Sequence, residues 1–311
     1  MNTLQLTTSI KKEIWEYKRI FIWLPAIIAS IIILAPLIGF LLIDGNLTTF
    51  FLNNNPNATW LGFWQEIAKV QHDKMFNVIA FSFSSMLFIP FLLIATLVQL
   101  YYFIACLFDE RRDLSILFWR SLPVSDSLTI GVKLLVGALI LPGLFLLAAT
   151  LTLGLFLILA FFLCTILALG FDISLWGLWS SSNIFSHMMT SWLNLLPYTL
   201  WMLPLYAWLM LVSMFSSKAP FLWAIIPVVV VLLVEAFIVH YFNLDSQILL
   251  GAITDYFAIS ENNVNHYLHD QQSISLVPMK VISSKISVFG IALAAAFIYA
   301  TYWLRANRSH H

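Results

Sequence analysis

Residues 134 to 169 read LLVGALILPGLFLLAATLTLGLFLILAFFLCTILAL, a stretch that contains no Asp, Glu, Lys or Arg. A helix that crosses the hydrocarbon core of a bilayer needs about 20 mostly apolar residues. This stretch is longer than that, so tilt, extension beyond the lipid or a kink at Pro142 must absorb the excess. The stretch therefore predicts a membrane-spanning helix.

The composition of the whole chain agrees with this prediction. Hydrophobic residues make up 61% of the 311 residues and charged residues 10%, whereas a soluble domain is about one-quarter charged. The formal net charge is zero, which excludes the strongly basic balance of a nucleic-acid-binding protein. We therefore expect an integral membrane protein that contacts the lipid bilayer and binds no nucleic acid.

Five further stretches are long and apolar enough to cross a bilayer, so the sequence predicts an all-α integral membrane fold with six transmembrane helices. The predicted spans are residues 20 to 43, 76 to 107, 134 to 169, 194 to 215, 220 to 242 and 282 to 304, in a single transmembrane domain over residues 1 to 311. Residues 3 to 19 predict an N-terminal interfacial amphipathic helix. Its apolar face is expected to carry Ile10, Ile14, Tyr17 and Phe21, and its other faces Lys11, Lys12, Glu13, Lys18 and Arg19.

The distribution of basic residues predicts which loops lie on the cytoplasmic side. With six spans and both termini in the cytoplasm, eleven of the fifteen Lys and Arg residues lie on the cytoplasmic side, as the positive-inside rule predicts. Division of residues 134 to 169 into two spans would instead place Lys218, Arg305 and Arg308 outside. We therefore expect six spans in a bacterial cytoplasmic membrane, with a cytoplasmic loop over residues 108 to 133 and an outer loop over residues 243 to 281.

The cytoplasmic loop contains a short amphipathic pattern. Four apolar residues at i, i+3, i+4 and i+8 predict one stripe of a helix: Leu114, Leu117, Phe118 and Leu122. Pro123 ends this helix, and Ser125, Asp126 or Ser127 then supplies the N-cap of the next one. The pattern alone leaves two interpretations open, a surface helix that covers the inner interface or a helix that contacts a partner.

Around this helix the sequence resembles the cytoplasmic loop of ABC type-2 exporter permeases. Residues 109 to 112 (DERR) match the acidic-Arg pair of that family, and residues 122 to 125 (LPVS) match its Leu-Pro-x-Ser step before a helix that begins near Lys133. The layout is similar as well, with an interfacial helix, six spans and a long outer loop before the last span.

The resemblance implies the membrane permease subunit of an ABC exporter, which moves an unidentified substrate out of the cytoplasm or the inner leaflet. The loop would be a coupling helix seated in a groove of a separate ATP-binding subunit, and a second permease copy or a related permease would pair with this chain. The implied ATPase-coupling residues are Glu110, Arg111, Arg112, Leu114, Leu117, Phe118, Trp119, Arg120, Leu122 and Pro123. The sequence has no phosphate-binding loop or hydrolase motif, so we expect no enzyme activity and no cofactor here, with ATP and Mg²⁺ bound by the partner.

Glu235 is the one acidic residue well inside a predicted span. A charge at that depth costs roughly 2.5 to 3.5 kcal/mol, so the side chain should face protein or a hydrated cavity, or be protonated. Glu235 either lines the translocation path or makes a structural hydrogen bond at a helix contact, and both interpretations stay open. For Gln99, Asn194 and His240 the structural interpretation is favoured.

Candidate metal ligands lack the spacing of a metal site. His266, His269 and Asp270 share a helical spacing and His187 precedes two Met residues, but no further ligands follow at fixed positions. We expect no metal site. Both cysteines, Cys106 and Cys164, lie in apolar stretches and are interpreted as small buried hydrophobes.

Three other functions share parts of this pattern. A secondary transporter would be expected to show inverted halves and several buried ionisable groups. A membrane enzyme would need polar and nucleophilic residues clustered near one membrane face. A non-transporting membrane scaffold or immunity protein would have the same hydropathy as a permease.

Overall fold

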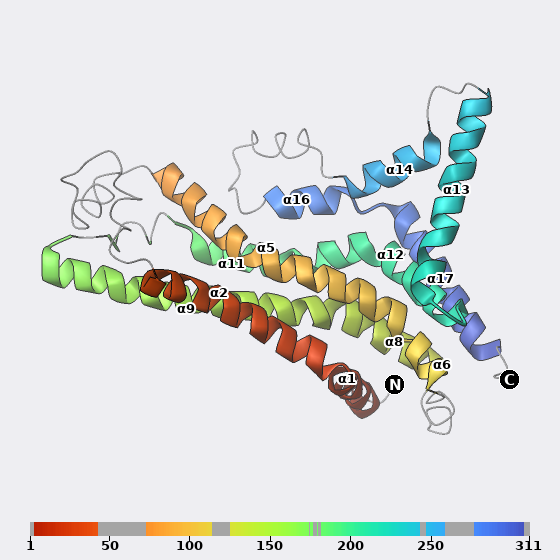
Figure 1. Cartoon of the computed structure of the whole chain (residues 1–311), viewed down its shortest axis with the longest axis horizontal. Coiled ribbons are helices and arrows are strands. Elements are labelled where there is room, and N and C mark those ends of the chain that lie inside the picture. The colour runs from red at the N-terminus through yellow and green to blue at the C-terminus, as the bar shows by residue number, and fades with distance from the viewer. Residues whose placement is uncertain are drawn as a thin grey trace. The chain divides into compact units, whose positions relative to one another are not determined.

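The computed structural model describes residues 3–42, 73–113, 125–173, 175–176, 179, 182–242, 247–258 and 277–307, and within them every regular element is a helix (Figure 1). Six helical segments of this described part are long and apolar enough to cross a membrane: Arg19–Pro36, Ala80–Arg112, Asp126–Phe171, Ile184–Phe215, Pro220–Phe242 and Val288–Asn307. Each overlaps one predicted span. The all-α, six-span fold of a multi-pass membrane protein is confirmed, and residues 134 to 169 belong to one helical segment.

The chain divides into two compact units. The first comprises Met1–Lys18, Ala95–Gly143 and Leu193–His311, and the second comprises Arg19–Ile94 and Leu144–Trp192. The long helices α5 (Asp73–Ala105) and α9 (Leu141–Phe171) each contribute residues to both units.

The second unit contains a π-helical turn, η1 (Arg19–Trp23), and helices α2 (Leu24–Leu42) and α11 (Ile184–Leu193), together with most of α5 and α9. Large side chains fill its core, among them Phe21, Phe88, Phe91 and Phe145. A smaller buried cluster near the end of α9 includes Cys164, against which Trp179 packs. The Trp179 indole N–H donates to Cys164 Sγ at 3.5 Å. Cys164 and Cys106 are both buried, which confirms their interpretation as buried hydrophobes.

The first unit carries the remaining helices. They are α1 (Thr3–Glu16), α6 (Phe108–Arg112), α8 (Asp126–Leu135), the π-helical turn η2 (Val136–Ile140), α12 (Leu195–Phe215), α13 (Pro220–Phe242), α14 (Ile248–Phe257), α16 (Val277–Ser284) and α17 (Val288–Asn307). Helix α12 lies at the centre, because it contacts α13, α16, α17 and η2. Tyr206 of α12 stacks on Phe103 of α5 with ring centroids 4.6 Å apart.

The π-helical turn η2 follows from Pro142. The Leu141 N–H donates to Val136 O, five residues earlier, and the residue five positions after Gly137 is Pro142, which has no N–H to donate. The Gly137 carbonyl would therefore lack a partner from its own helix. The Gln99 side chain of α5 fills this role, because its Nε2 donates to Gly137 O at 3.0 Å. An unsatisfied carbonyl inside a bilayer costs several kcal/mol, so this bond stabilises the turn.

Gly137 also allows helices to approach closely at this turn. A Cβ atom on Gly137 would lie 2.5 Å from Phe103 Cζ and 2.7 Å from Tyr102 Cδ1. Only glycine fits between these two rings. The turn therefore positions α5 against the segment that continues from α8.

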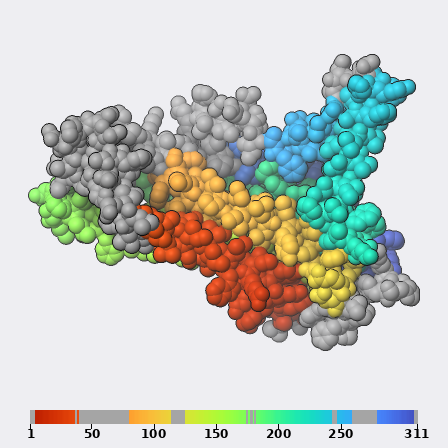
Figure 2. Space-filling view, viewed as in Figure 1, coloured from red at the N-terminus to blue at the C-terminus, as the bar shows by residue number. Residues whose placement is uncertain are grey.

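Helix α13 is apolar around most of its surface, interrupted by Glu235 and His240, and Ala224 is its one buried residue. Figure 2 shows it (cyan) uncovered along its length on the face in view. A helix that is apolar all round is stable where lipid or another protein covers it. This exposure agrees with a helix that contacts the bilayer.

Candidate functional site

The candidate site lies at the two ends of the loop between the second and third spans. The loop itself, residues 114 to 124, lies outside the described residues. Seven of the predicted coupling residues are therefore not described: Leu114, Leu117, Phe118, Trp119, Arg120, Leu122 and Pro123. The flanking helices, α6 before the loop and α8 after it, are described.

A hydroxyl from another helix fixes the start of α6. The Leu107 N–H and the Phe108 N–H donate to Ser213 Oγ of α12, at 3.1 and 2.9 Å. The first N–H groups of a helix have no partner within that helix, and here the Ser213 hydroxyl serves as the acceptor. Helix α6 is thereby attached to the last turn of α12.

Arg111 strengthens the same attachment. Its Nη2 donates to the carbonyl oxygens of Ser213, at 2.8 Å, and Ser216. The last carbonyl groups of a helix lack intrahelical donors and carry partial negative charge, so a guanidinium is a favourable partner for them. Arg111 therefore joins the beginning of the loop to the end of α12.

At the other end of the loop, a side chain caps the start of α8. Ser125 has an extended backbone conformation, and its Oγ accepts a hydrogen bond from the Leu128 N–H at 3.3 Å. This is the geometry of an N-cap residue. Of the three residues that the sequence offered for this role, Ser125 is the one that performs it.

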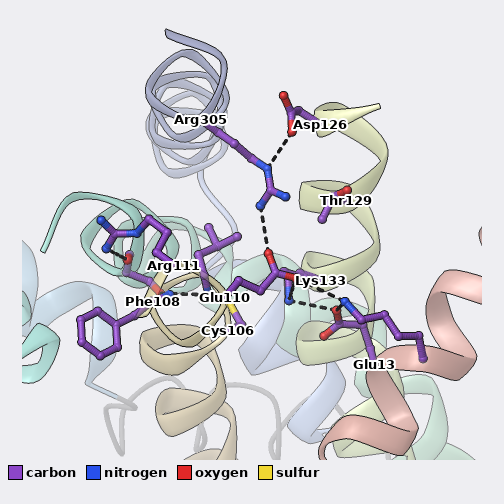
Figure 3. Close-up of polar contacts among 12 residues, drawn as sticks. Glu13, Cys106, Phe108, Glu110, Arg111, Asp126, Thr129, Lys133 and Arg305 are labelled. Atoms are coloured by element: carbon purple, nitrogen blue, oxygen red, sulfur yellow. Dashed lines mark hydrogen bonds and ion pairs between the residues drawn. The ribbon is translucent and has the colours of Figure 1, made fainter. Parts of the chain in front are cut away.

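A continuous chain of ion pairs connects the two ends (Figure 3). Lys133 Nζ of α8 lies 2.9 Å from Glu13 Oε1 of α1 and 3.2 Å from Glu110 Oε1 of α6. Arg305 Nη1 of α17 lies 3.2 Å from Glu110 Oε2, and Arg305 Nε lies 2.8 Å from Asp126 Oδ1. Four helices, α1, α6, α8 and α17, therefore meet in one polar cluster.

The centre of the cluster is deeply buried, and the charges of the whole cluster balance. Lys133 has an exposed fraction of 0%, while Glu13, Glu110 and Arg305 are each 2% exposed. Lys12 adds a third cation, 3.4 Å from Glu110 Oε1, so three carboxylates face three basic groups. Removal of one partner from a buried pair typically costs about 3 to 5 kcal/mol, because the remaining charge is left without compensation. We name this set, Lys12, Glu13, Glu110, Asp126, Lys133 and Arg305, the ionic cluster.

Helix α1 differs from its sequence prediction in two respects. It ends at Glu16, and Glu13 is not on an outer face but buried in the ionic cluster. The Tyr102 hydroxyl also donates to Glu13 Oε2 at 3.1 Å. Glu16, at the end of the helix, pairs with Lys12 at 3.7 Å. Burial raises the pKa of the Glu16 carboxyl, and repulsion from Glu13 raises it further.

The three described residues of the predicted coupling set have different surroundings. Glu110 belongs to the ionic cluster, where it pairs with Lys133 and Arg305. Arg111 points to α12. Arg112 is 61% exposed at its side chain and pairs with Asp109 and Asp113 at 3.3 and 3.1 Å. Contact of these residues with a second subunit stays a prediction.

The sequence pattern missed Glu13, Asp126, Lys133 and Arg305 as members of one site. A local signal exists for Lys133, which lies among the buried residues Ile130, Val132 and Val136. A single cation on an otherwise apolar helix face indicates a buried partner. The identity of that partner depends on packing between distant segments, which no spacing in the sequence reveals.

A second polar network lies within the predicted spans and contains no charge. Gln99 Oε1 accepts hydrogen bonds from the hydroxyls of Tyr206 and Tyr198, at 3.1 and 3.2 Å. Thr96 Oγ1 lies 3.1 Å from the Tyr198 hydroxyl oxygen. Together with the bond to Gly137 O, these contacts satisfy the Gln99 amide. Gln99 is therefore a structural residue, as the sequence favoured.

Glu235, on α13, caps the start of α14. Its carboxylate accepts hydrogen bonds from the Leu249 N–H and from the Leu250 N–H, the latter at 3.0 Å. These are the first residues of α14, where N–H groups have no intrahelical partner and the helix dipole favours a negative charge. The bonds favour the structural interpretation of Glu235, and a place in the translocation path stays a prediction.

The described residues hold no group of three or more His, Cys, Asp or Glu residues arranged to bind a metal ion. His187 is buried, with its ring 5.2 Å from that of Phe81 in an edge contact. His266, His269 and Asp270 lie outside the described residues.

Comparisons with protein-family models, with characterised proteins and with solved structures found no match to this chain.

Proposed function

We propose that this chain is the membrane permease subunit of an ATP-driven exporter of the ABC type-2 class. The observation that carries the proposal is the attachment of both ends of the loop at residues 114 to 124. Glu110 lies before the loop and Lys133 after it, and in the ionic cluster Lys133 Nζ lies 3.2 Å from Glu110 Oε1. A loop that receives mechanical work from a partner needs such anchorage, because force on a free loop would only deform the loop.

The anchorage gives the loop a route to three other helices. Glu13 connects the ionic cluster to α1, Arg305 connects it to α17, and Arg111 connects the start of the loop to α12. Coupling between distant sites travels through packed elements and ion-pair networks of this kind. In our proposal, movement of the loop on ATP hydrolysis displaces these helices together.

The proposal divides the predicted coupling residues into two groups. The apolar and aromatic residues of the loop, with Arg112 and Arg120, contact the ATP-binding subunit. Glu110 and Arg111 are positioning residues, because their side chains engage α8, α17 and α12 of the chain itself. Interface anchors are typically aromatic and Arg side chains, whereas charges at the rim set orientation.

The partner would bind ATP and Mg²⁺, and two permease copies or two related permeases would enclose the path. In this arrangement the chain lies in a bacterial cytoplasmic membrane, with both termini and the loop in the cytoplasm. The sequence resemblance and the positive-inside distribution support this orientation. The role of Glu235 as a helix cap weakens the alternative of a secondary transporter, for which a functional carboxylate within a span would be the main support.

Co-purification from the native host tests the proposal. The full chain with an affinity tag is isolated in mild detergent, and bound proteins are identified by mass spectrometry against an unrelated multi-pass protein that carries the same tag. We expect a subunit with a phosphate-binding loop to be enriched, together with Mg²⁺-dependent ATP hydrolysis. Transport by the purified chain alone, without a nucleotide-binding subunit, would contradict the proposal.

A further inference from the structure

We propose that the outward face of α1 binds the headgroups of anionic phospholipids. Three residues carry this inference: Lys11 and Trp15, four positions apart on α1, and Lys18, two residues after its end. All three side chains are exposed, Trp15 to 61%. We name these three residues the basic face. The inference requires a membrane protein but does not depend on an exporter function.

The two sides of α1 have different environments. One side places Glu13 in the buried ionic cluster, where Lys133 neutralises it at 2.9 Å. Glu16, at the edge of the exposed side, pairs with Lys12. Glu13 is thus engaged within the protein and Glu16, although exposed, pairs with Lys12, while Lys11 and Lys18 form no ion pair among the described residues. The basic face therefore presents uncompensated positive charge.

Within the basic face, the Trp15 ring positions the Lys18 ammonium. Lys18 Nζ lies 4.7 Å from the centroid of the Trp15 ring, a cation–π contact that orders the ammonium at the surface. Tryptophan favours the boundary between lipid and water, because its ring is apolar and its N–H is polar. An exposed Trp held beside a lysine suits the level of lipid phosphates better than bulk water.

The chain itself places this face at a membrane boundary. The first membrane-spanning segment begins at Arg19, immediately after Lys18, so Lys18 lies where apolar sequence begins. In Figure 2 the N-terminal residues (red) form part of the surface in view. The charge of the face complements phosphate, and its position and Trp15 select a lipid rather than a soluble anion.

Native mass spectrometry of the full chain in detergent measures this binding. The probe is phosphatidylglycerol, with zwitterionic phosphatidylcholine as the comparison, and the readout is the apparent Kd of the first bound lipid. Each basic residue at an anionic membrane surface strengthens binding by about 1 kcal/mol. Loss of both charges in Lys11→Gln/Lys18→Gln should therefore weaken phosphatidylglycerol binding roughly 30-fold. Phosphatidylcholine binding should change little.

Two controls make the test specific. Lys11→Arg/Lys18→Arg keeps the charge and should bind phosphatidylglycerol as the original chain does. Lys218→Gln removes an exposed charge elsewhere and should have no effect. Unchanged phosphatidylglycerol binding in Lys11→Gln/Lys18→Gln would overturn the inference. So would competition by glycerol phosphate at concentrations equal to the lipid, because it would indicate a site for soluble anions.

Discussion

Lys133 Nζ lies 2.9 Å from Glu13 Oε1, although 120 residues separate them in sequence. The same ammonium lies 3.2 Å from Glu110 Oε1, so one cation neutralises carboxylates from two helices. A buried charge is stable only where partners compensate for its loss of hydration. This contact therefore defines how α1, α6 and α8 fit together at the ends of the loop.

Replacement of Lys133 by Met should destabilise the protein by about 3 to 5 kcal/mol, because Glu13 and Glu110 would keep their burial and lose their shared partner. Unfolding in detergent by guanidinium measures the change. The matched control is Lys218→Met at an exposed position, for which we expect a change within about 0.5 kcal/mol. Equal stability of the two variants would show that the ionic cluster does not hold these helices.

Replacement of Gly137 by Ala should also destabilise the fold, by about 1 to 3 kcal/mol. The new methyl group would lie 2.5 Å from Phe103 Cζ, so α5 and η2 would have to separate. Gly131→Ala is the control, because no atom lies within 4 Å of a Cβ at that position and alanine favours a helix over glycine. Unfolding of both variants at the same denaturant concentration would show that α5 and η2 do not pack closely at Gly137.

The cap on α14 predicts a local effect at Glu235. In Glu235→Leu the Leu249 and Leu250 amides lose their acceptor, and their hydrogen exchange should accelerate about fivefold, the equivalent of about 1 kcal/mol for a lost cap. Glu235→Gln keeps one acceptor oxygen and should show a smaller change. Altered transport in Glu235→Gln with no change in exchange would instead favour a place in the translocation path.

Thiol labelling tests the orientation that we propose. The native cysteines are buried, so single introduced cysteines should dominate the signal. A cysteine at Asn262 should react with an impermeant reagent in intact spheroplasts, and a cysteine at Ser309 should react only after lysis. Reaction of the Ser309 position from outside would exclude the six-span topology with both ends in the cytoplasm.

The fold could be predicted because the length of an apolar segment is a local property of the sequence. Each of the six spans corresponds to a helical segment of the structure, and Ser125 was among the three predicted caps. The positions of helix ends were less certain: α1 ends at Glu16 rather than near Arg19, because the chain changes to a π-helical turn as the first span begins.

The ionic cluster could not be predicted, because its members come from residues as far apart as Glu13 and Arg305. Each has a plausible local role as a surface charge, and only packing reveals that Glu13 and Lys133 are buried. The π-helical turn was likewise unpredicted, although Pro142 was named as the place of a possible kink. Its position requires the Gln99 amide, 38 residues away, to complete the hydrogen bonding of Gly137.

The central claim, that the loop couples this chain to an ATPase, is tested most directly by ATP hydrolysis and transport in Phe118→Ala/Trp119→Ala. The matched control is Phe221→Ala/Trp223→Ala, the same pair of ring types at exposed positions of α13. Because aromatic anchors typically dominate an interface, we expect the loop variant to remain folded in the membrane while binding of the ATP-binding subunit or coupled transport falls at least roughly tenfold, and the control to keep both. Assembly and transport at control levels in Phe118→Ala/Trp119→Ala would contradict the claim.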